Sequence, residues 1–112
     1  MNHPKFTIFK GNDDQYYFRL TARNGEPILA SEGYQNKSSC ENGIQSVKEN
    51  AQEDDQFDRQ ESADGQFYFV LVAKNGQPIG KSEMYTTEKG RDNGIESVKN
   101  TAPAAAIDDT TA

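Results

Sequence analysis

Hydrophobic and polar residues alternate along two stretches of the chain, residues 15–23 (QYYFRLTAR) and 66–74 (QFYFVLVAK). A period of two predicts a β-strand, because successive side chains of a strand point to opposite faces of the sheet. One face is apolar in both stretches, and it carries Tyr16, Phe18, Leu20 and Ala22, and Phe67, Phe69, Leu71 and Ala73. We expect helices to cover this face. The other face carries Tyr17, Arg19 and Thr21, and Tyr68, Val70 and Val72. The second of these sets is the more apolar, and we expect it to be partly covered.

Apolar residues recur at helical spacing further along, at positions 40, 44, 47 and 51 and again at positions 95, 98 and 102, with Arg91 in place of Cys40. This spacing predicts helices over residues 37–50 and 87–100. Asn36 is suited to cap the first helix, and Thr86 or Thr87 the second. A shorter helix that begins at each Asn-Gly is disfavoured, because about eight residues make an unstable helix.

Turn residues divide the remaining sequence into short strands. Asn24-Gly25 and Asn75-Gly76 predict hairpins in which both central turn residues have positive φ. Asp64-Gly65 is a similar signal, and Asp13-Asp14 is a weaker one. These turns predict further strands over residues 6–10, 57–61, 26–31 and 77–82. Each unit therefore has three strands followed by one helix.

The unit occurs twice. Residues 6–51 align without a gap on residues 57–102, and 21 of the 46 positions are identical. We expect an α+β domain over residues 1–102, made of two tandem β-β-β-α repeats with pseudo-twofold symmetry and an antiparallel sheet with both helices on one face. Residues 52–56 form an acidic linker, and residues 103–112 (PAAAIDDTTA) are expected to be a flexible tail.

Each predicted helix contains an interior glycine, Gly43 or Gly94. Glycine within a helix costs about 1 kcal/mol relative to alanine. The helical phase places both glycines on the inward side, together with Cys40 and Val47 in the first repeat and Val98 in the second. We expect that another backbone approaches each glycine too closely to leave room for a side chain.

Four motifs recur with a spacing of 51 residues: Tyr17-Phe18-x-Leu20, Asn24-Gly25-x-x-Ile28, Ser31-Glu32-x-Tyr34 and Gly43-Ile44-x-Ser46-Val47-Lys48. This tandem pattern resembles the YegP-like family of small bacterial proteins. The resemblance implies an α+β fold of two β-β-β-α repeats. It also implies that single-repeat relatives build the same body as homodimers. It implies no activity and no catalytic residues, because none are established for the family.

The charge of the chain limits its partners. The formal net charge is −6, and 27% of the residues are charged. An acidic surface repels phosphates, so it disfavours non-specific binding to nucleic acids and to anionic membranes. The N-terminal sequence lacks an apolar run typical of a signal peptide, and Cys40 is the single cysteine. We therefore expect a cytoplasmic protein.

Catalytic and metal-binding patterns are weak throughout the sequence. The only histidine, His3, lies near the chain start, so Cys40 has no plausible imidazole partner. The carboxylates fall in turns and in the linker without the spacing of a calcium loop. The glycines do not form a phosphate-binding loop. The sequence therefore predicts no catalytic residue, no metal site and no cofactor, and hence no enzyme.

Two candidate binding features remain. The first is Tyr17 with Arg19 and Tyr68, on the sheet face opposite the helices. Aromatic side chains on an open sheet can stack with bases, although tyrosine also simply suits a half-exposed strand. The second is the repeated Ser-Glu-x-Tyr, which is either a polar patch or turn chemistry before the helix.

These features predict a monomeric, non-enzymatic binding or accessory module with an unknown protein or ligand partner. The alternative is single-stranded nucleic-acid binding through Tyr17 and Tyr68, which the net charge makes the less favoured of the two.

Overall fold

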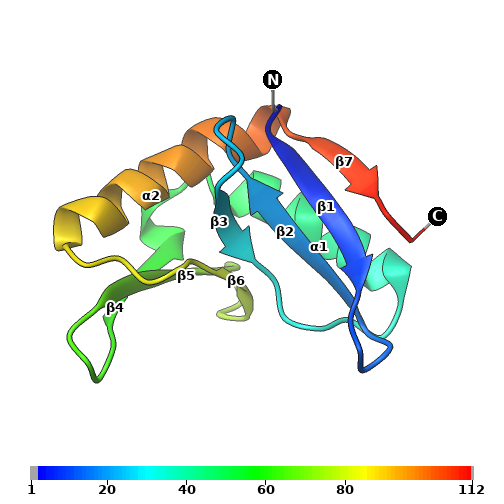
Figure 1. Ribbon diagram of the computed structural model, residues 1–112, viewed down its shortest axis with the longest axis horizontal. Coiled ribbons are helices and arrows are strands. Elements are labelled where there is room, and N and C mark those ends of the chain that lie inside the picture. Colours follow the sequence, from blue (N-terminus) through cyan, green and yellow to red (C-terminus); the bar gives the residue numbers. More distant parts are fainter. Residues whose placement is uncertain (1–2, 112) are drawn as a thin grey trace.

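A seven-stranded sheet carries two α-helices on one face in the computed structural model, which describes residues 3–111 (Figure 1). The strands are β1 (Lys5–Lys10), β2 (Tyr16–Thr21), β3 (Pro27–Ala30), β4 (Phe57–Glu61), β5 (Phe67–Val72), β6 (Pro78–Lys81) and β7 (Ala106–Asp109). The helices are α1 (Lys37–Asn50) and α2 (Glu88–Thr101), with short 3₁₀ turns η1 (Asp54–Gln56) and η2 (Ala102–Ala104). The strand order is β4-β5-β6-β3-β2-β1-β7. The prediction of an α+β fold of two β-β-β-α repeats is confirmed.

The two repeats meet at the centre of the sheet. Strands β3 and β6 pair antiparallel through Ala30 and Lys81, which occupy equivalent positions in the two repeats. This pair therefore lies on the pseudo-twofold axis. Helix α1 packs on β2 and reaches β6, and α2 packs on β5 and reaches β3. Because each helix covers strands of both repeats, the buried apolar side chains form one core.

The helix termini are set by side-chain caps. Asn36 Oδ1 accepts a hydrogen bond from Ser39 N at 2.8 Å, and Thr87 Oγ1 accepts one from Gly90 N at 2.9 Å. Each bond satisfies a backbone N–H that has no partner within the first helical turn. The predicted start of α1 is confirmed, and of the two threonines it is Thr87 that caps α2.

The hairpin turns differ from the prediction. Ala22 N donates to Glu26 O at 2.9 Å, so the loop between β2 and β3 has three residues. Within residues 3–111, the residues with positive φ are Asp14, Gly25, Gly65 and Gly76, one in each hairpin loop. The expectation of two such residues per turn is wrong, because these loops combine a type I turn with a single left-handed residue. The side chain of Asn24 instead accepts a hydrogen bond from Glu26 N at 3.0 Å.

Two equivalent residues beside the axis differ in size. Leu29 is 1% exposed, and its counterpart in the second repeat is Gly80. A Cβ atom on Gly80 would lie 2.8 Å from Leu29 Cγ and 2.9 Å from Leu29 Cδ2. The leucine of one repeat therefore occupies the space that a side chain of the other repeat would need, which breaks the internal symmetry.

Gly80→Ala is expected to lower the free energy of unfolding by about 1 kcal/mol through overpacking against Leu29. In a Leu29→Ala background the same change is expected to stabilise, because the contact is gone and alanine is about 0.5–1 kcal/mol better than glycine within a strand. Urea unfolding of the four proteins measures both effects. An effect of Gly80→Ala that is the same in both backgrounds would contradict this account.

Residues 103–111 are ordered, so the prediction of a flexible tail is wrong over this range; Ala112 lies outside the described residues. After η2, Ala105 is 2% exposed, and β7 then pairs parallel with β1 (Figure 1). Thr110 N donates to Ile8 O at 3.0 Å. The sheet is therefore antiparallel except at this outer pair of strands.

Two ion pairs hold β7 in place. Lys5 Nζ lies 3.3 Å from Asp108 Oδ2, and Lys37 Nζ of α1 lies 2.9 Å from Asp109 Oδ2. The bond from Lys37 and those from Thr111 hold the pKa of Asp109 at about 2, below its ordinary value of 3.8. The second repeat has Gln56 and Glu88 at the positions of Lys5 and Lys37. The charges therefore direct the acidic strand to β1 and not to β4.

Because the pKa of Asp109 is low, the free energy of unfolding depends on pH in the acid range. A carboxyl whose folded pKa is depressed stabilises the fold above its unfolded pKa and loses this contribution as the pH falls through the folded pKa. Asp109→Asn is therefore expected to destabilise at pH 7, with a difference from the parent that shrinks from about pH 4 to about pH 2. Urea unfolding over this pH range measures it. A difference that stays constant down to pH 2 would contradict the assignment.

Candidate functional site

The sheet face opposite the helices carries the three predicted binding residues. Tyr17 and Arg19 lie on β2 and Tyr68 lies on β5, so β3 and β6 separate the two tyrosines. The structure places all three on one face but does not bring the tyrosines together. Their use as a binding site stays a prediction.

Cations and aromatic rings alternate on this face. The rings of Phe9 and Tyr17 are stacked, with centroids 5.7 Å apart and an interplanar angle of 15°. The guanidinium of Arg19 lies 4.8 Å from the centroid of Phe9, and Lys81 Nζ lies 4.8 Å from the centroid of Tyr68. Sequence reasoning missed Phe9 and Lys81. The sequence placed Phe9 in a predicted strand over residues 6–10 but did not indicate which face it occupies.

A hydrogen bond fixes the end of the Tyr17 ring. Its hydroxyl donates to Asp13 Oδ2 at 2.6 Å. This bond raises the pKa of Tyr17 above its ordinary value and lowers the pKa of Asp13. Tyr17 is therefore held as a neutral donor, and its ring keeps one orientation on the sheet.

A hollow of about 320 Å³ lies at the pseudo-twofold axis on this part of the surface. Across the sheet, Ala30 of β3 pairs with Arg19 of β2 on one side and with Lys81 of β6 on the other. These three residues line the hollow together with Glu83. The small side chain of Ala30 leaves room between the two cations. This arrangement suits an anionic group that approaches the centre of the sheet.

The Ser-Glu-x-Tyr motif joins each third strand to the following helix. Ser31 Oγ accepts from Phe18 N at 2.9 Å and donates to Glu32 O at 2.9 Å. Ser82 makes the same two bonds, to Phe69 N and Glu83 O. The serine therefore has a structural role, as turn chemistry would require.

The tyrosine of this motif explains the helix glycines. A Cβ on Gly43 would lie 2.8 Å from Tyr34 Cζ and 3.0 Å from Phe18 Cε2, and one on Gly94 would lie 2.8 Å from Tyr85 Cζ. Both glycines are buried, so the predicted inward orientation is confirmed. The predicted close approach of a backbone is wrong, because the atoms that fill the space belong to aromatic side chains.

The titratable groups give no support for a catalytic centre. Cys40 is fully buried, and burial raises the pKa of its thiol to about 11, far from that of a reactive thiolate. His3 is exposed at the start of the described chain. Within residues 3–111, no group of three or more His, Cys, Asp and Glu side chains is arranged to hold a metal ion.

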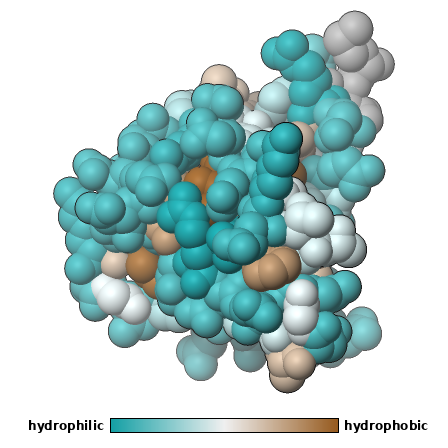
Figure 2. All heavy atoms as spheres, turned by 90° about the vertical axis from the view of Figure 1, so that its left-hand side faces the viewer, coloured by the Kyte–Doolittle hydropathy of each residue, from teal (hydrophilic) through white to brown (hydrophobic). Residues whose placement is uncertain are grey.

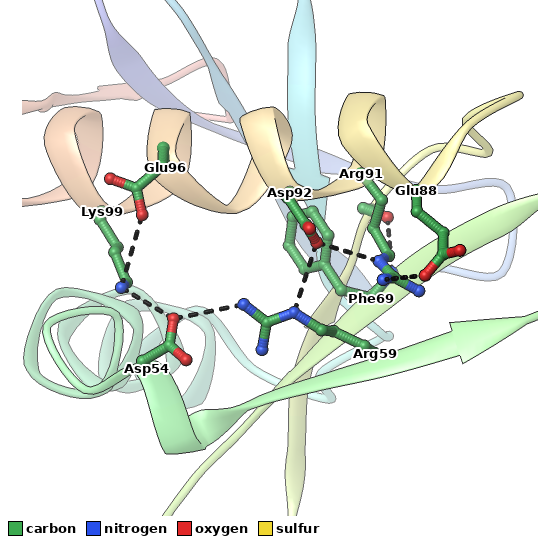
Figure 3. A network of polar contacts seen from close by, with 9 residues as sticks. Asp54, Arg59, Phe69, Glu88, Arg91, Asp92, Glu96 and Lys99 are labelled. Atoms are coloured by element: carbon green, nitrogen blue, oxygen red, sulfur yellow. Dashed lines mark hydrogen bonds and ion pairs between the residues drawn. The ribbon is translucent and has the colours of Figure 1, made fainter.

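A network of ion pairs connects α2 to β4 and η1 (Figure 3). Arg59 contacts Asp54 at 3.3 Å and Asp92 at 3.4 Å, while Lys99 contacts Asp54 at 2.9 Å. Arg91, whose side chain is 10% exposed, contacts Asp92 at 3.3 Å and lies over Phe67. The basic groups are thus paired with carboxylates, so this network acts as a structural clamp.

The surface beside this clamp is hydrophilic. Figure 2 shows the left-hand side of Figure 1, near β4 and the start of α2, where the hydrophobic patches are small and separate. The edge strand β4 itself contains Asp58, Arg59 and Glu61. Charged residues of this kind discourage pairing of an edge strand with another chain. No helix in the described range 3–111 is both long enough and apolar enough to cross a bilayer.

A family model described as a domain of unknown function, DUF1508, matches residues 12–58 and matches again over residues 62–109. The chain belongs to the DUF1508 family. Each match covers the second and third strands and the helix of one repeat. The relatives of this DUF1508 protein confirm the resemblance to YegP-like proteins.

A UPF0339 protein in the ptx operon 5′ region of Stutzerimonas stutzeri is 49% identical over 102 residues, which cover 91% of this chain and 92% of the relative. The UPF0339 protein YegP of Escherichia coli K12 is 42% identical over 106 residues, which cover 95% and 96%. These names assign no activity, substrate or partner to the relatives.

Two solution NMR structures have the same fold as this DUF1508 protein. YegP from E. coli, described as a protein of unknown function, superimposes with a TM-score of 0.92 at 40% identity and covers 98% of this chain and 95% of its own. A UPF0339 protein from Shewanella oneidensis superimposes with a TM-score of 0.89 at 40% identity and covers 95% and 90%. The mixed sheet with two helices is therefore the fold of this family.

Proposed function

We propose that this DUF1508 protein is a non-enzymatic, cytoplasmic binding module, and that its partner docks on the sheet face opposite the helices. One observation carries the proposal: Arg19 and Lys81 flank Ala30 at the centre of this face, and each cation lies over an aromatic ring. A rigid surface of rings and cations offers contact area at a low entropic cost.

The partner is an acidic segment of another protein. The chain as a whole has a net charge of −6, so the two cations of this face stand out from an otherwise acidic molecule. Carboxylates of a partner fit the hollow between Arg19 and Lys81, and the rings beside it contact the apolar parts of the same segment. The overall negative charge disfavours anionic membranes as the partner.

Single-stranded nucleic acid is the second candidate, because Phe9, Tyr17 and Tyr68 share the face and aromatic rings can stack with bases. The contacts among these side chains favour the protein partner. Phe9 is already in contact with Tyr17 and Arg19, and Tyr68 is in contact with Lys81. A base would have to displace these neighbours before it could stack.

NMR titration of the isotope-labelled protein tests the proposal, with an alternating Glu-Ala hexapeptide and a single-stranded oligonucleotide as probes at two salt concentrations. Arg19→Gln and Lys81→Gln are each expected to weaken peptide binding about threefold, and the control Lys89→Gln, at an exposed site on α2, is expected to leave it unchanged. Stronger binding of the oligonucleotide would favour the second candidate. If neither probe perturbs β2 and β5, the proposed face is wrong. Affinity capture from the native cell would then identify the partner itself.

The protein is expected to be a monomer at micromolar concentration, because the second repeat supplies the surface that a single repeat would need from another chain. Strand β7 covers the outer edge of β1, and β4 is charged. Light scattering measures the mass in solution. A stable dimer would contradict the expectation, and the half-buried Val70 and Val72 would then be the first candidates for its interface.

A further inference from the structure

A groove runs along α1, between this helix and the β5–β6 hairpin of the other repeat. Its first part, about 370 Å³, is lined by Tyr34, Asn42 and Ser46 on one side and by Asn75 on the other. Its second part, about 420 Å³, continues past Asn50 to Glu53. Both parts are lined by Ala73 and Asn75, so they form one groove. Neither repeat alone contains it.

The lining of this groove is unusually similar in the two repeats. Nine of the twelve residues that line its first part are identical to their counterparts 51 positions away, against 21 of 46 for the repeats as a whole. Tyr34, Gly43 and Asn75 have the structural roles described above. Such roles do not account for Glu32 and Asn42. Within residues 3–111, the side chains of these two exposed residues, and of their counterparts Glu83 and Asn93, form no hydrogen bond or ion pair.

The polar groups of the groove suit a peptide backbone. Asn42, Ser46 and Asn50 follow each other at helical spacing and present amides and a hydroxyl along one side of α1. Asn50 is 8% exposed; its amide nitrogen donates to Ser46 O at 2.8 Å, and no hydrogen bond among the described residues uses its Oδ1. Because Asn50 lines the second part of the groove, this acceptor is placed to receive a backbone N–H.

The charges of the groove select the side chains of that peptide. Glu32 lies at one end, Glu49 and Glu53 lie at the other, and Lys74 is the only basic residue in the lining. The carboxylates repel phosphates and attract ammonium and guanidinium groups. From Ser39 to Glu49 the helix rises about 15 Å, which matches about five residues of extended chain.

We propose that this groove binds an extended segment of another protein that carries lysine or arginine side chains. Asn42, Ser46 and Asn50 bind its backbone, and Glu32, Glu49 and Glu53 bind its basic side chains. The proposal is independent of the sheet face with Arg19 and Lys81, which selects acidic groups.

The pseudo-twofold axis places Glu83, Asn93 and Ser97 in an equivalent arrangement along α2. In this second arrangement the residue equivalent to Gly33 is Met84, which is 43% exposed. Gly33 lines the groove on α1, so that groove lacks the long side chain that its counterpart carries. The site on α1 is therefore the one that we assign.

The test is an NMR titration of the labelled full chain with an alternating Lys-Ala hexapeptide and with the Glu-Ala hexapeptide of the same length. The basic peptide is expected to shift the signals of α1 and of the β5–β6 hairpin. Asn42→Leu, which removes the amide at nearly constant size, is expected to weaken its binding about fivefold. Glu32→Gln is expected to weaken it about threefold, with a smaller effect at high salt.

Gln45→Leu is the matched control, because Gln45 is exposed on the same helix and does not line the groove. It is expected to leave binding unchanged, as is Arg19→Gln. Equal shifts of the α1 and β5–β6 signals with the two peptides, an equal loss with Gln45→Leu, or shifts by the basic peptide confined to the sheet face would each overturn the proposal.

Discussion

Gly43→Ala is expected to lower the free energy of unfolding by about 1–3 kcal/mol, and Gly94→Ala is expected to do the same. Alanine would ordinarily stabilise a helix by about 1 kcal/mol relative to glycine. Here its Cβ would lie 2.8 Å from Tyr34 Cζ or Tyr85 Cζ, well inside van der Waals contact. Both tyrosine rings are packed against the core, so neither can move away freely. Leucine at either site is expected to prevent normal folding.

Urea unfolding monitored by far-UV circular dichroism measures these changes, and Gly90→Ala is the matched control within α2. A Cβ on Gly90 would lie 3.2 Å from Thr87 Oγ1 and 3.5 Å from Tyr85 Cδ1, so it would meet far less resistance. We expect this variant to be neutral or slightly stabilising. Alanine variants at Gly43 and Gly94 that are as stable as the parent would show that the tyrosine rings do not restrict these positions.

The tyrosine hydroxyl is the atom that a side chain at Gly43 would meet first. Tyr34→Phe removes this oxygen, so Gly43→Ala is expected to be less destabilising in the Tyr34→Phe background. The coupling between the two changes is expected to be about 1 kcal/mol, as is usual for residues in contact. Additive effects of the two substitutions would mean that the clash is with the ring carbons of residue 34 or with Phe18, and not with the hydroxyl.

Removal of residues 105–112 is expected to lower the free energy of unfolding by about 2 kcal/mol or more, because the truncated chain loses a ladder of backbone hydrogen bonds and the burial of Ala105. For a domain of this size the loss corresponds to a fall of roughly 10 °C in the melting temperature. Scanning calorimetry measures it. The uncovered edge of β1 is also expected to promote self-association, which light scattering detects.

Ile107→Thr is the control for this truncation. Ile107 is 48% exposed, and threonine keeps the strand propensity, so the substitution is expected to change stability by less than about 0.5 kcal/mol. A truncated protein that melts at the temperature of the parent would mean that β7 contributes nothing to the fold.

Local pattern predicted the repeats, because the residues that build them are neighbours in the sequence. The alternation around Phe18 and Phe69 identified the buried face of the sheet, and Asn36 identified the start of α1. The inward phase of Gly43 was also predictable from helical spacing. The identity of its neighbour was not, since Tyr34 belongs to the segment before the helix and its direction depends on the whole packing.

Features that depend on distant parts of the chain were not predictable. The four residues of β7 are one alanine, one isoleucine and two aspartates, and a single isoleucine among them does not indicate a strand. The strand forms because β1 offers an unpaired edge, with Lys5 and Lys37 placed to receive its carboxylates. The groove along α1 was hidden for the same reason, because its two walls come from different repeats.

The pairing of β1 with β7 also bears on how the chain is made. Strand β7 leaves the ribosome about 100 residues after β1, which corresponds to about 5–20 s of synthesis. During that interval the nascent chain can collapse, but the edge of β1 stays open to other strands. A chain that ends before residue 106 keeps this edge unpaired. Strand β7 therefore covers the edge of β1 only in chains that extend through residue 109.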